Sequence, residues 1–450
     1  MTAIHAETAL LPSGLAHDVR VTFASAMIET VEVGVAAQAG DEIAPCLLPA
    51  IANLHSHAFQ RAMAGLAETR GPADDNFWSW RKEMYRFGLT MGPEHAEAVA
   101  AQLYMEMLEA GFCRVGEFHY LHHDTTGAPY ANPAEMAERI VAASCEAGIG
   151  LTLLPVFYAH ADFGGAPPLD GQRRFIHDLD AYARLMERAA ALVAALPGGV
   201  LGIAPHSLRA VTPDELTAIL PLARGGPIHI HVSEQTAEVD ACLAWSGARP
   251  VEWLLDHAPV DERWCLIHAT HMTEAECTAM AKSGATAGLC PLTEANLGDG
   301  IFPALAFLEE GGRFGVGSDS NIQISLAGEL RQLEYAQRLA HRSRNAIARP
   351  GGSTGLHLLE EALAGGGRAL GAPHGIAVAH PADLVTLDMS AVDWLPRAKT
   401  LDHFVFAEGI GIDGVWVGGA KRVADGRHVH RDQIAARFQQ AMRDLLANGD

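Results

Sequence analysis

The chain has 450 residues, of which 49% are hydrophobic and 19% charged, so it can build a sizeable core and exceeds the length of a typical single domain. Its formal net charge of −22, without any basic run, argues against nucleic-acid binding, because phosphate binding needs clustered Lys and Arg. No apolar run approaches the roughly 18 residues of a membrane helix, which argues against a membrane protein.

Two features of the sequence favour a cytoplasmic protein. The first residues, Met1 to Glu7, lack the basic segment followed by an apolar stretch that signal peptides have. The seven cysteines are odd in number, scattered along the chain and without a CxxC pair. We therefore expect reduced thiols that pack in the core.

The two ends of the chain have the character of β structure. Apolar and polar residues alternate over 19–23 and 28–33, as they do in a half-buried sheet. After about Ala372 the same character returns, with strands expected at 382–388 and 414–419 and a closing helix at 434–447. We predict one small β-sandwich domain built from both chain ends, with residues 1–47 as its first part and 373–450, including the closing helix, as its second.

Residues 48–372 have the pattern of a closed barrel. Apolar strand candidates alternate with helix-like stretches, which is typical of parallel sheets. Among the helices, 93–110 begins with a proline and 212–223 begins with a capping threonine followed by a proline. Eight such units predict an α/β protein with a (β/α)8 barrel. Its strands are expected at 48–55, 113–118, 151–157, 200–205, 227–231, 264–268, 286–290 and 313–317.

Two long loops are expected where the barrel strands end. Residues 69–76 are rich in Gly, Pro and Asp and lead into an aromatic run at 77–81, and residues 160–171 are rich in Gly and Pro. Long loops in a compact domain often act as lids or binding segments. Whether the loop around Trp78 and Trp80 closes over a substrate is left open by the sequence.

The first barrel strand ends in two histidines. His55 and His57 are two residues apart, so in an extended strand both side chains point to the same side. This arrangement is half of a metal site, although an isolated HxH is more often a polar strand end. Because residues at the carboxyl ends of barrel strands converge on one mouth, the other strand ends decide between these two interpretations.

Metal-compatible side chains recur at the other strand ends. Strand five ends in His231, strand six in His268, and strand eight runs into Asp319. An Asp in that position could also cap the next helix. Three histidines, a carboxylate and a water molecule together fit a divalent metal site, which makes hydroxide available near neutral pH. The pattern therefore predicts hydrolysis.

Further polar residues follow strands four and five. Glu234 comes three residues after His231 and could act as a general acid or base, or could simply lie in the first turn of the following helix. His229, deeper in strand five, is expected to have a core or supporting role. Strand four ends at His206.

Several of these motifs resemble those of the amidohydrolase superfamily. The matching motifs are HxH at strand one, HxxE at strand five, His268 at strand six and Ser318-Asp319 at strand eight. Strand four ends in Pro205-His206-Ser207, where binuclear members carry a bridging carboxylated lysine, and this departure resembles the mononuclear deaminase branch. Longer stretches are similar to members of that branch that act on formimino amino acids, and these stretches are 53–63, 117–120, 206–211 and 293–300.

The resemblance implies metal-dependent hydrolysis of N-formimidoyl-L-glutamate to N-formyl-L-glutamate and ammonia, a step of histidine degradation. It implies that Asp319 accepts a proton from the attacking water, that His268 stabilises the tetrahedral centre, and that Glu234 protonates the departing nitrogen. The implied cofactor is one divalent metal ion, with zinc expected, although the same donors accept iron or manganese. The implied metal ligands are His55, His57, His231 and Asp319.

The resemblance also implies a pocket for a small anionic substrate. Its two carboxylates need planar bidentate donors, and Arg81 and Arg209 match the family's carboxylate-binding positions. Gln60, Tyr120 and His206 match its other polar contacts. Two alternatives stay open, namely a deaminase of another amidine or of a purine, and a non-catalytic barrel that serves as a scaffold. A homodimer is a further expectation, because homodimers are common among such barrels.

Overall fold

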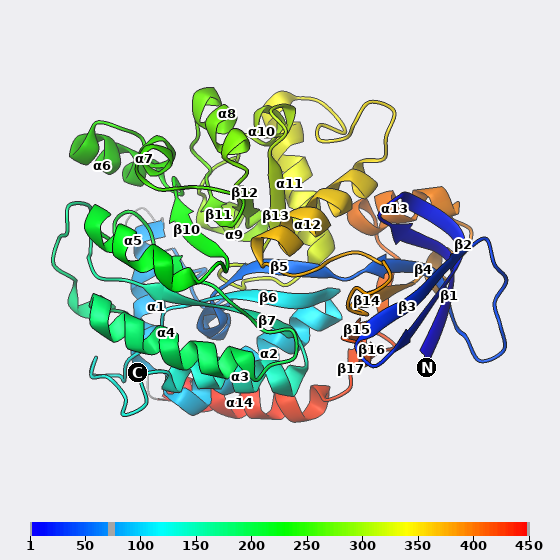
Figure 1. Ribbon diagram of the computed structural model, residues 1–450, viewed down its shortest axis with the longest axis horizontal. Helices are drawn as coiled ribbons and strands as arrows, with labels where there is room; N and C mark the ends of the chain where they lie inside the picture. Colours follow the sequence, from blue (N-terminus) through cyan, green and yellow to red (C-terminus); the bar gives the residue numbers. More distant parts are fainter. Residues whose placement is uncertain (1, 71–76, 448–450) are drawn as a thin grey trace.

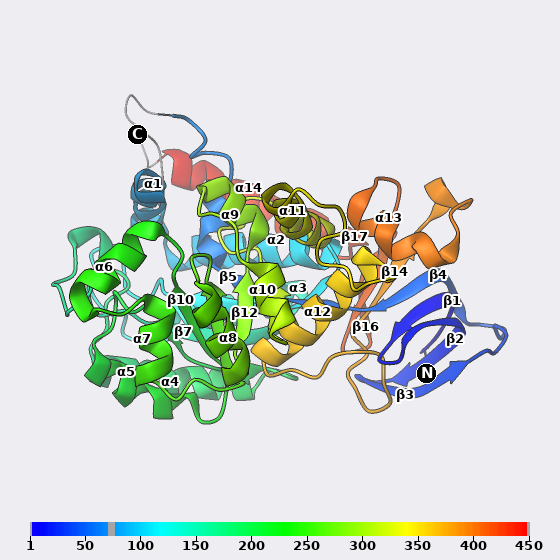
Figure 2. The same cartoon turned by 90° about the horizontal axis from the view of Figure 1, so that it is seen from above.

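The computed structural model describes residues 2–70 and 77–447. These residues form a barrel surrounded by helices, with a sheet domain at one end of the molecule (Figures 1 and 2). Most of the predicted loop at 69–76 lies outside the described residues. Within the described ranges, no helix is long and apolar enough to cross a membrane.

Both ends of the chain contribute to one hydrogen-bonded sheet with the strand order β17-β16-β15-β14-β4-β1-β2-β3. The two ends meet at the antiparallel pair of β14 and β4, in which Val385 lies opposite Leu48. Val19, Val21 and Phe23 alternate along β2 and are buried. The strands are β1 (Thr2–Leu11), β2 (Gly14–Ala24), β3 (Met27–Val33), β4 (Glu42–Pro49), β14 (Leu384–Asp388), β15 (Gly411–Val417), β16 (Ala420–Ala424) and β17 (Arg427–His428). The prediction of a small β domain built from both chain ends is confirmed.

The structure has parallel strands at all eight predicted barrel positions. The first begins later than predicted, because Leu48 and Pro49 still belong to β4. Gly202 divides the fourth position, and a Cβ atom there would be 2.4 Å from the backbone oxygen of the residue before β10. The strands are β5 (Ile51–Ser56), β6 (Phe112–His119), β7 (Gly150–Phe157), β8 (Val200–Leu201), β9 (Ala204–Pro205), β10 (Ile228–Val232), β11 (Trp264–His268), β12 (Thr286–Leu289) and β13 (Arg313–Val316). A bridge between Ser56 and Asp319 joins the eighth position to the first.

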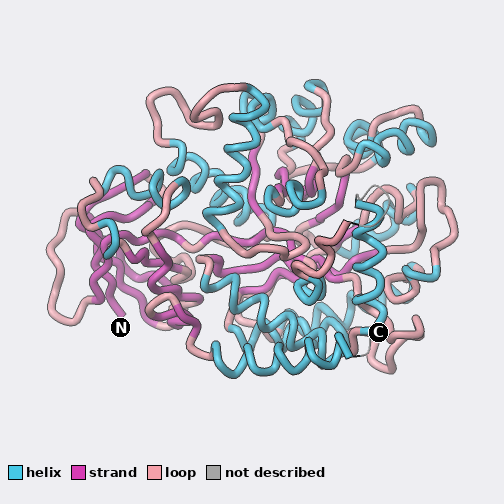
Figure 3. The backbone as a smooth tube through the Cα atoms, turned by 180° about the vertical axis from the view of Figure 1, so that it is seen from behind, coloured by secondary structure: helices cyan, strands magenta, loops and turns pink. Residues whose placement is uncertain are grey.

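Helices cover the outside of the barrel (Figure 3). The predicted helix at 212–223 is split into α5 and a 3-10 turn at 220–223, because Pro221 lacks the N–H group that would continue the helix. Thr212 caps α5 by accepting the N–H of Glu215, as its sequence predicts. The barrel helices are α2 (Pro93–Glu109), α3 (Glu135–Ala147), α4 (Leu179–Ala194), α5 (Pro213–Ile219), α6 (Thr236–Ser246), α7 (Pro250–His257), α8 (Glu274–Ser283), α9 (Pro291–Leu297), α10 (Ala304–Glu309), α11 (Leu326–His341) and α12 (Thr354–Ala369).

The aromatic run at 77–81 is not a loop as predicted but opens a helix, α1 (Phe77–Thr90). Met84 and Phe87, three residues apart, are both buried in one hydrophobic cluster with Phe59 and Phe175. This buried face, rather than the composition of the run, decides its conformation. Arg81 is therefore carried by a helix.

The closing helix α14 (Arg431–Ala447) packs beside α2, below the barrel in Figure 1. Arg437 donates to Glu97 of α2 at 2.9 Å and to Glu146 of α3 at 2.6 Å. Leu445 is buried in the same cluster as Met84 of α1. The closing helix therefore packs on helices of the barrel. One more helix, α13 (Thr400–Phe406), lies between β14 and β15 in the chain.

Apolar side chains fill much of the lower interior of the barrel. Leu54 of β5, Cys265 of β11 and Cys290 after β12 are buried in one cluster. All seven cysteines are free, and six of them are buried. The expectation of core thiols is wrong for Cys145, which is exposed on α3. His229 of β10 is buried at the same depth, opposite Cys265, and its Nε2 is 2.7 Å from the carbonyl oxygen of Ala369.

Candidate active site

Four side chains converge at the mouth of the barrel. The donor atoms of His55, His57, His231 and Asp319 all lie within 4.8 Å of one another, and all four residues are buried. Oδ1 of Asp319 is 3.4 Å from Nε2 of His55 and 3.2 Å from Nε2 of His57. Nε2 of His231 is 3.1 Å from Nε2 of His55. The residues expected as one metal-binding set therefore form one cluster in space.

Backbone hydrogen bonds between β5 and the segment after β13 fix three of these residues. The N–H of Asp319 donates to the carbonyl of His55, and the N–H of His57 donates to the carbonyl of Asp319, both at 3.0 Å. Gly317 allows this approach, since a Cβ atom there would be 2.7 Å from the backbone nitrogen of His55. Asp319 has a φ of 46°, a left-handed conformation that the surrounding structure must enforce.

A buried polar network, which we call the seam clamp, consists of Asn53, Ser318 and Asn321. Asn53 donates to Oγ of Ser318 at 2.7 Å and accepts the N–H of Ser318 at 3.1 Å. Ser318 donates to Oδ1 of Asn321 at 2.6 Å, and Asn321 donates to the carbonyl of His57 at 3.0 Å. The clamp therefore links the backbone on both sides of the metal-binding set. Sequence reasoning missed Asn321, because the residue follows no motif spacing.

The orientation of the histidine rings fits a bound cation. Nδ1 of His57 is 3.0 Å from the carbonyl oxygen of Phe118, and Nδ1 of His231 is 3.0 Å from that of His206. Since a carbonyl only accepts, Nδ1 donates in both rings, and Nε2 is the nitrogen directed at the cluster. Burial lowers the pKa of His55 to about 3 and that of His231 well below its usual value, so both rings are neutral. Neutral imidazoles and a carboxylate are donors that a divalent metal ion binds.

Glu234 and His268 lie beside this cluster. Nε2 of His268 is 3.7 Å from Oε1 of Glu234 and 4.0 Å from Oδ2 of Asp319. Burial raises the pKa of Glu234. Burial would lower the pKa of His268, but Glu234, Glu294 and Asp319 outweigh it and raise that pKa to about 10. The pair can hold and exchange protons next to the metal-binding set.

Sequence reasoning missed two buried carboxylates that hold these side chains. Oε1 of Glu294 is 3.2 Å from Nδ1 of His268 and accepts the N–H of Cys290 at 2.9 Å. Glu238 accepts the N–H groups of Glu234 and of the residue before it, each at 3.2 Å. Both acids lie in the first turn or two of a helix that follows a barrel strand, which is the one signal in the sequence that could have indicated them.

The five residues expected to bind substrate line one cavity at the barrel mouth. Nε2 of Gln60 donates to Oη of Tyr120 at 2.7 Å. Nη2 of Arg81 donates to Oη of Tyr158 at 3.0 Å, and Tyr158 was not predicted. The residues that line the cavity are His57, Gln60, Trp80, Arg81, Met84, Tyr120, His206, Arg209, His231, Glu234, His268, Leu297 and Asp319. Two arginines thus face the same enclosed space as the metal-binding set.

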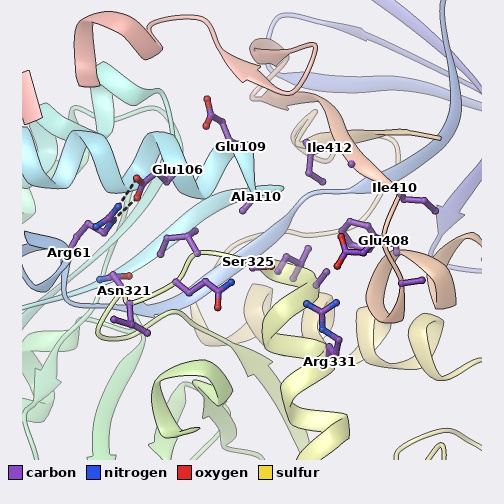
Figure 4. Close-up of a pocket in the computed structure, with 18 residues that line it drawn as sticks. Arg61, Glu106, Glu109, Ala110, Asn321, Ser325, Arg331, Glu408, Ile410 and Ile412 are labelled. Atoms are coloured by element: carbon purple, nitrogen blue, oxygen red, sulfur yellow. Dashed lines mark hydrogen bonds and ion pairs between the residues drawn. The ribbon is translucent and has the colours of Figure 1, made fainter. Parts of the chain in front are cut away.

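A second pocket lies outside the barrel mouth (Figure 4). It is bordered by the end of α2, by residues 321–327 after β13 and by residues 404–412. Arg61 and Glu106 form an ion pair of 2.7 Å on its wall. Of the described residues expected to bind metal or substrate, none lines this pocket, so the predicted chemistry belongs to the first cavity.

The chain is similar to known hydrolases along its length. Residues 46–422 match the family described as "Amidohydrolase family". The chain belongs to the amidohydrolase family. Residues 1–44 of this amidohydrolase match a second description, "Formimidoylglutamate deiminase HutF, N-terminal domain".

Individual relatives of this amidohydrolase agree with the family match. Formimidoylglutamate deiminase from Pseudomonas aeruginosa is 50% identical, over 99% of this chain and 100% of that protein. The crystal structure of an amidohydrolase from Brucella melitensis is 56% identical, with a TM-score of 0.97 over 99% of this chain and 100% of that one. An adenosine deaminase from Xanthomonas campestris with bound zinc is 22% identical, with a TM-score of 0.81 over 99% and 98%, and shares the fold. The predicted α/β barrel with an additional β domain is confirmed.

Proposed function

We propose that this amidohydrolase converts N-formimidoyl-L-glutamate and water into N-formyl-L-glutamate and ammonia, a step of histidine degradation. The observation that carries the proposal is the presence of Arg81 and Arg209 in one enclosed cavity with the metal-binding set. The relative from Pseudomonas aeruginosa, 50% identical over nearly the whole chain, supports the same activity.

The cavity suits a glutamate moiety with a formimino group. The guanidinium of Arg81 lies 5.2 Å from the centre of the Tyr85 ring and donates to Tyr158, so it is already oriented before a carboxylate binds. Oε1 of Gln60 is buried and has no hydrogen-bond partner in the described part of the chain. We assign this oxygen to an N–H of the formimino group, because an unmade buried hydrogen bond is costly. Arg209 is assigned to the second carboxylate.

We propose one zinc ion at the metal-binding set, held by Nε2 of His55, His57 and His231 and by the carboxylate of Asp319. A divalent ion held by these residues would lower the pKa of a water molecule towards about 7 and so would supply hydroxide at neutral pH. The backbone hydrogen bonds of His57 and Asp319 hold their side chains in place before the ion binds.

The chain's own residues move the protons. Asp319 accepts a proton from the attacking water while the oxygen of that water forms a bond to the formimino carbon. His268 stabilises the charge that develops on the tetrahedral centre. Its ring is held in the charged imidazolium form because the carboxylates of Glu234 and Asp319 lie 3.7 and 4.0 Å from Nε2 and raise its pKa. Both protons of the water end on the formimino nitrogen, and Glu234 delivers them. The first arrives when the water attacks. The second comes from the hydroxyl of the tetrahedral centre, so that the C=O bond forms, the C–N bond breaks and ammonia leaves.

The substrate assignment is tested by measuring ammonia release from N-formimidoyl-L-glutamate, a formimino analogue with one carboxylate, guanine and adenosine. Loss of one charge-assisted contact costs roughly 1.5–3 kcal/mol, so we expect kcat/KM for the analogue to fall about 10- to 100-fold. A higher kcat/KM with a purine would replace this proposal by the purine deaminase alternative. No ammonia release from any compound, together with no bound metal, would favour a scaffold.

Three expectations from the sequence stay predictions. These are the homodimer, the cytoplasmic location and the domain borders between residues 47 and 48 and between residues 372 and 373. Light scattering on the purified protein measures the first directly.

A further inference from the structure

One stretch that resembles the family, residues 293–300, has no role in the mechanism above. It begins within α9, directly after the seventh barrel strand β12. Glu294 lies in this helix and is 5% exposed. Its side chain contacts the end of the neighbouring strand β11, where Oε1 is 3.2 Å from Nδ1 of His268. A buried carboxylate therefore touches the side of the His268 ring that faces away from Glu234.

The carboxylate of Glu294 is itself fixed in place. The oxygen that faces His268 also accepts the N–H of Cys290 at 2.9 Å, so it is anchored to the end of β12. His268 ends β11 with a φ of 66°, and Ala269 follows with a φ of 47°. These left-handed conformations turn the chain sharply at the residue whose ring is directed at Glu234 and Asp319.

We infer that Glu294 is a positioning residue for His268. By accepting a hydrogen bond from Nδ1, it fixes the plane of the ring, which leaves Nε2 directed at Glu234 and Asp319. A carboxylate that orients a histidine in this way is a general device of hydrolytic sites, where a wrongly oriented ring loses most of its effect. The kinetic consequence rests on the proposed function, whereas the orientation of the ring does not.

Glu294 could instead serve only to hold the start of α9, and the chain offers a matched control for that role. Glu329 of α11 is fully buried and accepts the N–H of Leu292, also in the first turn of α9, at 2.9 Å. No contact between Glu329 and His268 is present among the described residues. If the loss of Glu294 acted only by loosening the start of α9, then Glu294→Ala and Glu329→Ala should have the same effect on kcat.

The kinetic test compares Glu294→Ala with Glu329→Ala. Loss of a supporting contact of this kind typically costs 10–100-fold, so we expect Glu294→Ala to lower kcat about that much, with KM nearly unchanged. Glu294→Gln keeps an oxygen for both hydrogen bonds and should restore part of kcat. Glu329→Ala should keep kcat near the wild-type value. Metal content should be equal in all variants, since Glu294 contacts none of the four metal-binding residues.

A double-mutant cycle separates positioning from stability. In a His268→Gln background, Glu294→Ala should cause almost no further loss of kcat, because the residue through which it acts is gone. An equal loss in both backgrounds would overturn the inference.

A second readout does not depend on activity. In protein labelled with ¹⁵N at the histidine rings, the His268 signals are identified by their disappearance in His268→Gln. We expect a protonated Nδ1 in wild type and in Glu329→Ala, and altered ring signals in Glu294→Ala. Unchanged signals in Glu294→Ala would contradict the inference. If wild-type protein released no ammonia from N-formimidoyl-L-glutamate, the proposed function would fail, while the ring signals would still decide the role of Glu294.

Discussion

Each histidine of the metal-binding set uses its two ring nitrogens differently. In His57 and His231, Nδ1 donates to a backbone carbonyl and Nε2 faces the shared centre. The carbonyls come from the neighbouring positions of the barrel, Phe118 within β6 and His206 directly after β9, so the parallel strand arrangement itself directs Nδ1 of each ring. Backbone carbonyls therefore orient the rings for a cation. These carbonyls cannot be identified from the spacing of the histidines in the sequence.

Glu234 is the residue to change first. We expect Glu234→Gln to lower kcat by about 10²- to 10⁴-fold, because general acid–base groups contribute that much and an amide cannot deliver the proton. Steady-state ammonia release measures the effect, and metal analysis should show an unchanged content. Turnover within about tenfold of wild type would rule out this role for Glu234.

The two arginines should control affinity for the substrate carboxylates. We expect Arg81→Met and Arg209→Met each to lower kcat/KM for N-formimidoyl-L-glutamate about 10- to 100-fold, which corresponds to the loss of a charge-assisted hydrogen bond. Arg349→Met is the matched control, because Arg349 contacts Glu361 outside the cavity. Unchanged kinetics in both pocket variants would refute the assignment of the two carboxylates.

Residues at the strand ends could be predicted from the sequence, and the residues that support them could not. His231 lies near the end of one apolar strand and Asp319 follows another, so the barrel rule places them at the mouth. Glu294 meets His268 only because the turn after β12 directs its side chain back to β11. No local spacing encodes that contact.

At the scale of elements, the junction of β5 with the segment after β13 holds the site together. The seam clamp of Asn53, Ser318 and Asn321 is completely buried, and it joins parts of the chain that are far apart in sequence. Since the clamp bonds to the backbone of His57, it should act on the geometry of the metal-binding set rather than on the substrate.

Asn321→Ala should therefore weaken metal binding. Loss of an outer contact to a metal site typically costs 10–100-fold in affinity, and we expect a similar rise in the dissociation constant for zinc, measured by chelator competition. Asn132→Ala is the control, because it removes a part-buried hydrogen bond from the N–H of Ala134 in another part of the chain. Equal zinc affinity in wild type and Asn321→Ala would show that the clamp has no such role.

Element positions were predictable where apolar periodicity was strong, as in the barrel strands. The predictions were wrong where a single residue or a weak pattern determined the secondary structure. Pro221 ends α5 early because it lacks an N–H, and the sequence prediction extends the helix through it. In α1, the buried pair of Met84 and Phe87 is separated by charged and polar residues, which obscured the helical face.

At the scale of the whole molecule, a cluster of four histidines lies apart from the metal-binding set. The rings of His122 and His177 have centroids 4.5 Å apart, and those of His123 and His177 4.7 Å apart. The ring centroids of His119 and His122 are 5.2 Å apart. Burial lowers the pKa of His119 and of His177 to about 3, and that of His122 well below its usual value.

This cluster should make the fold sensitive to acid. In the unfolded chain a histidine titrates near about 6.5, so between about pH 3 and 6.5 the unfolded state binds more protons than the folded state. The free energy of unfolding should therefore fall as the pH decreases through that window. In His177→Gln one such group is missing, and the slope should be smaller by up to about 1.4 kcal/mol per pH unit. Urea unfolding of metal-depleted protein between pH 5 and 7 measures the slope, and equal slopes would contradict this account.

The most direct test of the central claim is metal removal and return, followed by ammonia release from N-formimidoyl-L-glutamate. The account predicts that chelated protein loses activity and that one equivalent of zinc per chain restores it. The same protocol applied to His231→Ala should give no restoration, because one of the four donors is missing. Full turnover by metal-free protein would contradict the claim that His55, His57, His231 and Asp319 form the hydrolytic centre.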